Sequence, residues 1–143
     1  MTAEPRPTGL LDTSTVILLP RISDAGVLPR VPLISAVSLA ELAVGPLVAA
    51  TGVERARRQA QLQQAEADFD PLPFDAAAAR AFGRVAVALR RAGRKPAARA
   101  YDALIAATSI ANGYPLYTVN PGDFTGIDDL EVVPVPHSDA GEP

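Results

Sequence analysis

Residues 101–113 read YDALIAATSIANG, the pattern of a helix that is buried on nearly all sides. Asp102 is the only charged residue in this stretch, and Leu104, Ile105 and Ile110 surround it in the sequence. Burying a carboxylate without a partner is costly. The stretch therefore predicts a helix enclosed by other layers of structure, and its one acid needs a specific explanation.

The rest of the chain alternates between short apolar runs and helical patterns. Strands are expected at 9–12, 32–35, 71–74, 116–119 and 130–135, and helices at 54–68, 76–92 and 97–112. A helical turn is expected at 16–19, and Ser38 with Glu41 forms a capping-box pattern that would open a further helix. Asp75 is expected as an N-cap, and Gly93 and Gly113 as helix ends. Short apolar strands separated by helices favour a three-layer α/β/α sandwich with a central, mainly parallel sheet.

The length and composition limit the possible classes of protein. We expect a single domain over residues 9–135, with flexible tails at 1–8 and 136–143 that are rich in Pro, Gly and acidic residues. No segment resembles a signal peptide or a membrane span, so a cytoplasmic protein is expected. Cysteine is absent, and the single histidine, His137, lies in the C-terminal tail. Disulfides, thiolate catalysis and catalysis by a histidine base are therefore excluded or disfavoured.

Basic residues are concentrated in one part of a chain whose net charge is −3. No acid occurs from residue 76 to residue 101, and this span holds seven of the thirteen basic residues. Such asymmetry suggests a basic face, and an ordinary solvated helix face is the alternative. The basic residues of this span are Arg80, Arg84, Arg90, Arg91, Arg94, Lys95 and Arg99.

Each long apolar segment retains a single acid. Asp12 is the only charged residue between Pro7 and Pro20, Glu41 the only one in 31–53, and Asp102 the only one in 101–122. Asp12 follows an expected strand, as Asp123 does after the run at 116–119. Ligands of open parallel sheets bind at the carboxyl ends of strands, so these acids are expected to converge.

Converging carboxylates repel, because two unit charges about 4 Å apart cost roughly 4 kcal/mol at an effective dielectric near 20. A site with only oxygen ligands favours a hard cation, Mg²⁺ or Mn²⁺.

Each acid also has a purely structural interpretation. Asp12 could cap the turn that follows it, and Glu41 could be the partner of Ser38 in a capping box. Asp123 could belong to a Pro-Gly-Asp turn, and Asp102 could pair with Arg99, one turn earlier. One shared metal site explains all four more economically.

The stretches LLDTST with Asp12, ISAVSLAEL with Glu41, YDALIAATSIANG with Asp102 and LYTVNPGDF with Asp123 occur in the order found in a known family. Over residues 9–135 the chain resembles the PIN-domain ribonucleases and, among them, the VapC toxins of toxin-antitoxin pairs. The resemblance implies a PIN fold and a Mg²⁺- or Mn²⁺-dependent endoribonuclease. It also implies a homodimer, a cognate VapB-type antitoxin and an RNA substrate, for which a tRNA is one candidate. With such a substrate, the seven basic residues of 80–99 are the candidate RNA-binding residues, because they would neutralise backbone phosphates.

Carried over by position, Asp12, Glu41, Asp102 and Asp123 are the catalytic and metal-binding acids. Asp12 and Asp102 would bind the metal directly, and Glu41 and Asp123 would either bind it through water or position the nucleophile. Thr13, Ser14 and Thr118 would support the ligands. Asn120 matches a position that is acidic in some relatives, so either Asn120 or Asp123 completes the site.

The apolar run at 42–53 bears on partner binding. It could form a groove for an antitoxin helix, and core packing is the alternative.

Other functions fit less well. A haloacid dehalogenase phosphatase would need a second aspartate where Ser14 stands. A receiver domain would need paired acids before its first helix and a lysine near its last strand. A non-catalytic PIN domain that only binds partners would be expected to have lost some of its acids.

Overall fold

The computed structural model describes residues 7–95 and 99–137. Its centre is a four-stranded sheet of order β2-β1-β3-β4 in which all pairs are parallel. The strands are β1 (Thr8–Leu11), β2 (Val31–Leu33), β3 (Leu116–Thr118) and β4 (Val132–Pro134). The expected parallel sheet is confirmed, and β1 begins at Thr8.

Successive strand residues face two separate hydrophobic cores. Leu10 and Leu116 belong to one core, and their neighbours Leu11 and Tyr117 belong to the other. This alternation follows from the two-residue period of a strand, so both faces of the sheet must be covered.

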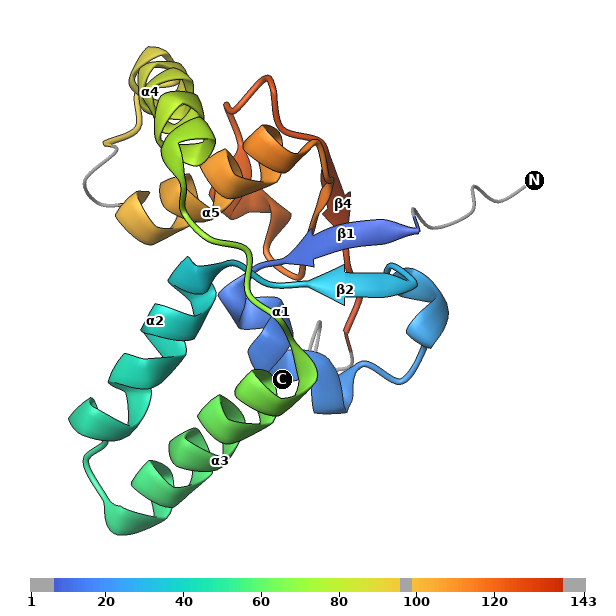
Figure 1. Cartoon of the computed structure of the whole chain (residues 1–143), viewed down its shortest axis with the longest axis vertical. Coiled ribbons are helices and arrows are strands. Elements are labelled where there is room, and N and C mark those ends of the chain that lie inside the picture. The colour runs from blue at the N-terminus through green and yellow to red at the C-terminus, as the bar shows by residue number, and fades with distance from the viewer. Residues whose placement is uncertain (1–6, 96–98, 138–143) are drawn as a thin grey trace.

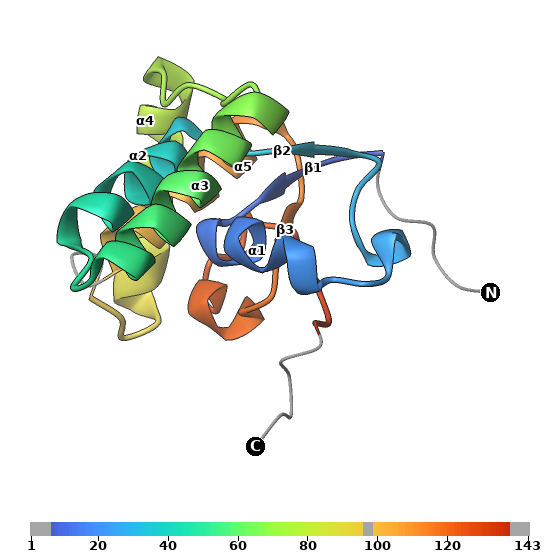
Figure 2. The same ribbon diagram turned by 90° about the horizontal axis from the view of Figure 1, so that it is seen from below.

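Helices supply that cover. These are α1 (Thr13–Leu18), α2 (Ala36–Val44), α3 (Gly52–Asp68), α4 (Ala76–Arg91) and α5 (Ala100–Asn112). Helices α4 and α5 lie on one side of the sheet, and α1 and α3 on the other (Figures 1 and 2). The three-layer sandwich predicted from the sequence is therefore confirmed.

Helix α5 is the expected buried helix. Its residues Ala103, Ile105, Ala106 and Ala107 are completely buried, and Tyr101 is exposed. Gly113 ends it in the left-handed conformation, with φ of 69°. The helix begins at Ala100 among the described residues, whereas the sequence suggested a start at 97; residues 96–98 lie outside the described part.

Two local predictions were wrong. Segment 71–74 forms only an isolated bridge between Ser35 and Leu72, because Pro71 and Pro73 have no N–H group for a strand ladder. The capping box of Ser38 and Glu41 is also absent. Ser35 is the N-cap of α2, and its hydroxyl accepts a hydrogen bond from Ser38 N at 3.1 Å, so Glu41 lies inside the helix.

Short 3₁₀ segments connect these elements. They are η1 (Leu19–Arg21), η2 (Ala25–Val27), η3 (Gly45–Val48) and η5 (Pro121–Phe124). Helices α2 and α3 form a hairpin through η3 that extends from the body of the protein (Figure 1). No helix in the described ranges has both the length and the apolar composition needed to cross a membrane.

Candidate metal centre

The candidate acids lie at the carboxyl edge of the two central strands. Asp12 directly follows β1, and Asp123 lies in η5, just after β3. Glu41 comes from α2 and Asp102 from the first turn of α5. Strands β1 and β3 are neighbours in the sheet, so the topology brings the ends of four separate segments together.

Asp12 is the most enclosed of these acids, with 3% of its surface exposed. One carboxylate oxygen, Oδ1, accepts hydrogen bonds from the backbone N–H and the hydroxyl of Thr15. The other, Oδ2, accepts from the Thr118 hydroxyl at 2.7 Å. Asp12 is therefore the N-cap of α1, as the structural alternative proposed, but the Thr118 contact across the sheet goes beyond capping.

Burial raises the pKa of Asp12, and the hydrogen bonds from Thr15 and Thr118 oppose that shift. The carboxylate is thus held in place by neutral hydroxyls and no cation balances its charge within the described residues.

Glu41 is held by the residue that follows Asp12. The Thr13 hydroxyl donates to Glu41 Oε1 at 2.6 Å and lies 2.9 Å from the Ser38 hydroxyl. Burial raises the pKa of Glu41, with a smaller contribution from the negative charge of Asp12. Thr13 therefore connects the end of β1 to α2.

Asp102 has neither a hydrogen bond nor an ion pair for its side chain within the described ranges. Burial raises its pKa to about 6, and the negative charges of Asp123, Asp12 and Glu41 add to the shift. The charge of Arg99 lowers this pKa and is the smallest of these effects. Arg99 forms its ion pair with Asp123, so the alternative interpretation, a pair with Asp102, is not observed among the described residues. The helix also starts closer to Asp102 than predicted, and an acid in the first turn is favoured by the helix dipole.

Asp123 pairs with Arg99 instead. The Arg99 Nη1 atom donates to Asp123 Oδ1 at 3.0 Å, and both side chains remain partly exposed. Asp123 is thus the one candidate acid with a cationic partner in the described chain.

The charges of the four acids influence one another, but their carboxylate groups do not surround one common point. No group of three acidic, His or Cys side chains in the described ranges is arranged to hold a metal as it stands. Their oxygen-only chemistry nevertheless suits a hard divalent cation, and the pKa values of Asp12, Glu41 and Asp102 are raised. A bound cation would offset the repulsion among these carboxylates and favour their ionised forms.

The supporting residues only partly match expectation. Thr13 and Thr118 contact the acids as predicted. Ser14 makes no such contact in the described part of the chain. Asn120 contacts site residues through its backbone: its N–H donates to the Thr118 hydroxyl at 2.9 Å, and its carbonyl accepts from Asp123 N at 3.0 Å. Thr15 was missed, although a threonine three residues after an N-cap aspartate is a recognisable signal.

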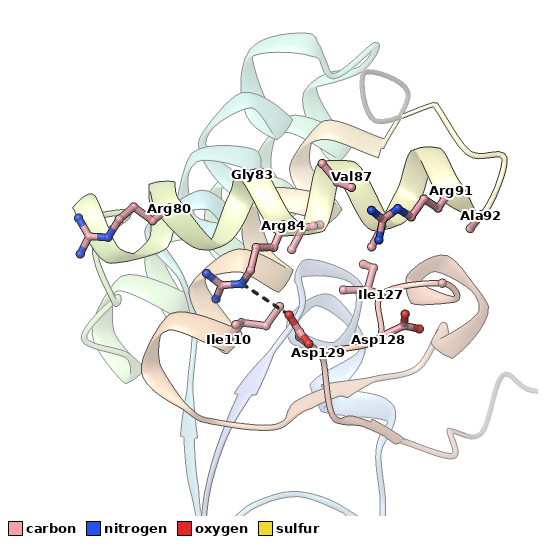
Figure 3. Close-up of a pocket in the computed structure, with 13 residues that line it drawn as sticks. Arg80, Gly83, Arg84, Val87, Arg91, Ala92, Ile110, Ile127, Asp128 and Asp129 are labelled. Atoms are coloured by element: carbon pink, nitrogen blue, oxygen red, sulfur yellow. Dashed lines mark ion pairs between the residues drawn. The ribbon is translucent and has the colours of Figure 1, made fainter.

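The basic residues of 80–99 do not form one face. Arg94 donates to backbone carbonyls of the segment that carries Asp123, and Arg99 pairs with its side chain. Arg80, Arg84 and Arg91 line a groove of about 750 Å³ between α4 and residues 126–129 (Figure 3). Arg90 and Lys95 are exposed.

The groove has acidic residues on its opposite wall. Arg84 Nε lies 3.5 Å from Asp129 Oδ2, and Asp128 lies beside it (Figure 3). The groove is thus of mixed charge rather than uniformly basic.

Comparisons with known proteins agree with this geometry. The PIN domain family model matches residues 10–129. The chain is 37% identical to ribonuclease VapC5 of Mycobacterium tuberculosis over 129 residues, which covers 89% of this chain and 93% of that protein. It is 34% identical to ribonuclease VapC4 of the same organism, covering 71% and 75% respectively.

Comparison with solved structures also finds a VapBC protein among the similar folds. A chain in the crystal structure of VapBC-5, a member of the VapBC family of toxin-antitoxin systems from M. tuberculosis, matches with a TM-score of 0.77 and 35% identity. The match covers 90% of this chain and 99% of that one. A chain of FitAcB from Neisseria gonorrhoeae matches with a TM-score of 0.67 and 25% identity, covering 86% and 94%. The chain belongs to the PIN-domain family.

Proposed function

We propose that this protein is the toxin of a VapBC-type toxin-antitoxin pair and acts as a metal-dependent endoribonuclease. The observation that carries the proposal is the gathering of four acids at the carboxyl edge of β1 and β3. Burial, followed by the negative charges of Asp123, Asp12 and Glu41, raises the pKa of Asp102 there. Four acids from distant parts of the chain share one electrostatic site. The similarity to the VapC ribonucleases supports RNA as the substrate.

Asp12 and Asp102 would bind Mg²⁺ or Mn²⁺ directly, and Glu41 and Asp123 would act through water or position it. The bound ion would supply Lewis acidity, lower the pKa of a water and neutralise charge on the phosphodiester. The chain's own residues hold the acids: Thr118 and Thr15 orient Asp12, and Thr13 orients Glu41. No histidine is needed for this chemistry.

RNA cleavage by the purified protein tests this function. We expect cleavage in Mg²⁺ or Mn²⁺, none in EDTA, and a loss of at least about 100-fold for Asp102→Asn. Asp70→Asn is the matched control, because Asp70 is exposed and lies outside the site. Cleavage that persists in EDTA or in Asp102→Asn would disprove the metal site. Tight partner binding without any cleavage would instead favour the non-catalytic PIN domain.

The exposed tip of the α2–α3 hairpin supports a partner site. Leu47 and Val53 are each 83% exposed, Val48 is 66% exposed and Val44 47%. Of the apolar run at 42–53, only Leu42 and Pro46 are buried, so core packing does not explain it. A hydrogen bond of 3.0 Å from Arg58 Nη1 to the Gly45 carbonyl holds the hairpin together.

We assign this tip to the VapB-type antitoxin, because an exposed apolar patch commonly marks a protein interface. Leu47→Asp should weaken binding of the cognate antitoxin, measured by calorimetry, by at least about tenfold. Val31→Asp is a control on a different surface, since Val31 is also half exposed. Equal affinity for both variants would place the antitoxin elsewhere.

The groove beside α4 supports homodimer formation. The groove carries both basic and acidic side chains, so a second copy related by a two-fold axis would offer opposite charges to each wall. Val87, which also lines the groove and is 47% exposed, would add an apolar contact. The opposing Asp128 and Asp129 make the same groove less suited to RNA phosphates. Arg90 and Lys95 are therefore the better candidates for RNA contacts.

Light scattering tests the dimer. Arg84→Asp should shift the protein toward monomer, and adding Asp129→Arg should restore the dimer by exchanging the two charges. A chain that is monomeric at all concentrations would contradict the proposal.

A further inference from the structure

The connection that follows α4 directs one arginine onto the segment that carries Asp123. After α4 ends at Arg91, Gly93 adopts a φ of 77°. The Arg94 backbone N then donates to the Leu89 carbonyl at 2.8 Å, and Leu89 is buried in the core. Arg94 is thereby anchored to the end of α4 by its own backbone.

The Arg94 guanidinium group bonds only to backbone in the described chain. Its Nη1 atom donates to the carbonyls of Asp123, at 3.2 Å, and Thr125, at 3.1 Å. Its Nη2 atom donates to the Gly122 carbonyl at 3.0 Å. These carbonyls lie in the last turn of η5 and just after it, where a cation is favoured, and the Gly122 carbonyl also accepts from Thr125 N at 3.4 Å.

The same segment is packed tightly against the end of α4. Phe124 is 2% exposed, and a Cβ atom at Gly126 would come within 2.7 Å of Ala92 Cβ. Gly126 also has a φ of 95°, which favours glycine. Residues 122–126 therefore have little room to shift while Arg94 and Phe124 stay in place.

We propose that Arg94 is a positioning residue for Asp123. Its three hydrogen bonds hold the backbone on both sides of Asp123 and so fix where that carboxylate stands relative to Asp102 and Asp12. This inference rests on the proposed function, because it assigns Asp123 to the metal site. It also replaces the expectation that Arg94 binds RNA phosphate.

Lysine substitution separates the two roles. A lysine retains the charge and can contact a phosphate, but a single ammonium group cannot reproduce a planar fork that spans three carbonyls. If Arg94 positions Asp123, Arg94→Lys and Arg94→Gln should both lower kcat for RNA cleavage about tenfold with KM nearly unchanged, the scale typical for residues that support metal ligands. If Arg94 binds phosphate, Arg94→Lys should restore cleavage, and Arg94→Gln should raise KM.

Two readouts do not depend on cleavage. Mn²⁺ affinity, measured without RNA, should fall about tenfold in both Arg94 variants. Amide exchange in metal-free protein should accelerate at residues 123 and 125, whose N–H groups bond to the Asn120 and Gly122 carbonyls. Arg30→Gln is the matched control: it removes a positive charge from an exposed position just before β2, at the opposite edge of the sheet from the acids, and should leave both Mn²⁺ affinity and exchange unchanged.

A second substitution tests whether Arg94 acts through Asp123. In an Asp123→Asn background, Arg94→Gln should reduce Mn²⁺ affinity by less than about twofold further, because the affected ligand is already lost. Wild-type Mn²⁺ affinity in both Arg94 variants, or full rescue of kcat by lysine, would overturn the inference. Failure of the wild-type protein to cleave RNA would refute the proposed nuclease, and the Mn²⁺ and exchange measurements would still decide the role of Arg94.

Discussion

The acids on the two sides of the site are held by different chemistry. On the strand side, Asp12 is buried and its two oxygens accept hydrogen bonds from Thr15 and Thr118. On the helix side, Asp123 is partly exposed and its position depends on the guanidinium groups of Arg94 and Arg99. Neutral hydroxyls leave the charge of Asp12 unbalanced, whereas Arg99 balances the charge of Asp123.

This difference suggests a division of roles. The strand side is part of the core, so disturbing it should cost stability as well as activity. On the helix side, the side chains of Arg99 and Asp123 are partly exposed, so disturbing their ion pair should cost activity with little loss of stability. The predictions below test this division.

The largest effect on stability should come from Thr118→Val. The substitution keeps the shape of a completely buried side chain but removes the hydrogen bond that the hydroxyl donates to Asp12 Oδ2 and the one that it accepts from Asn120 N. A buried carboxylate that loses a partner should destabilise the protein by about 2 kcal/mol, measured by urea unfolding. Cleavage should also fall by about tenfold or more.

Thr108→Val is the matched control for this change. Thr108 is also completely buried, but its hydroxyl donates to the Leu104 carbonyl within α5 rather than to a carboxylate. Its loss should cost less than about 1 kcal/mol. Equal losses of unfolding free energy in the two variants would mean that the hydrogen bond to Asp12 contributes no more to stability than an ordinary hydrogen bond within a helix.

An intermediate effect is expected from pH in the metal-free protein. The pKa of Asp102 is about 6 in the folded protein, whereas the ordinary value for an aspartate is 3.8. The folded protein therefore disfavours the ionised form of Asp102 relative to the unfolded chain. Its destabilising contribution is therefore absent below about pH 4, grows between about pH 4 and pH 6, and is complete above that range. The raised pKa values of Asp12 and Glu41 act in the same direction.

Thermal unfolding across this pH range measures the effect. We expect Asp102 to account for about 1 kcal/mol after allowance for solvent screening. Asp102→Asn should reduce the pH dependence, and saturating Mg²⁺ should remove most of it in the wild-type protein. A wild-type curve that does not change between Mg²⁺ and EDTA would contradict the view that the acids accumulate uncompensated charge.

The pattern of isolated acids predicted Asp12, Glu41 and Asp102 as candidate site residues, and Asp123 was added because it follows an expected strand. Asp12, Glu41 and Asp102 could be recognised because a charge within a long apolar segment is expensive to retain. The parallel sheet followed from the same segments. What the pattern could not provide was the partner of each acid, because partners such as Thr118 and Asp12 are 106 residues apart in the chain.

Local ambiguity explains the remaining differences. Ser35 and Ser38 are both good N-cap residues, and only the end of β2 decides that Ser35 begins α2. The arginines of 80–99 were treated as one group because a sequence shows charge but not direction. In the structure, Arg94 donates to the backbone of the Asp123 segment, Arg99 pairs with the Asp123 side chain, and Arg84 faces Asp129.

The smallest effect on stability should come from the ion pair on the helix side. The side chains of Arg99 and Asp123 are 35% and 42% exposed, so water already solvates much of each charge. Arg99→Gln and Asp123→Asn should each change the free energy of unfolding by less than about 0.5 kcal/mol in metal-free protein, and the double variant should show a similarly small coupling.

The same variants should differ in Mn²⁺ affinity, and this contrast completes the test of the two sides. Asp123→Asn removes a candidate ligand and should weaken Mn²⁺ binding, whereas Arg99→Gln removes a competing cation and should leave it equal or stronger. If Arg99→Gln destabilises the protein as much as Thr118→Val does, the helix side is structural and the division of roles is wrong. If it weakens Mn²⁺ binding, Arg99 orients Asp123 toward the ion more than it competes with it.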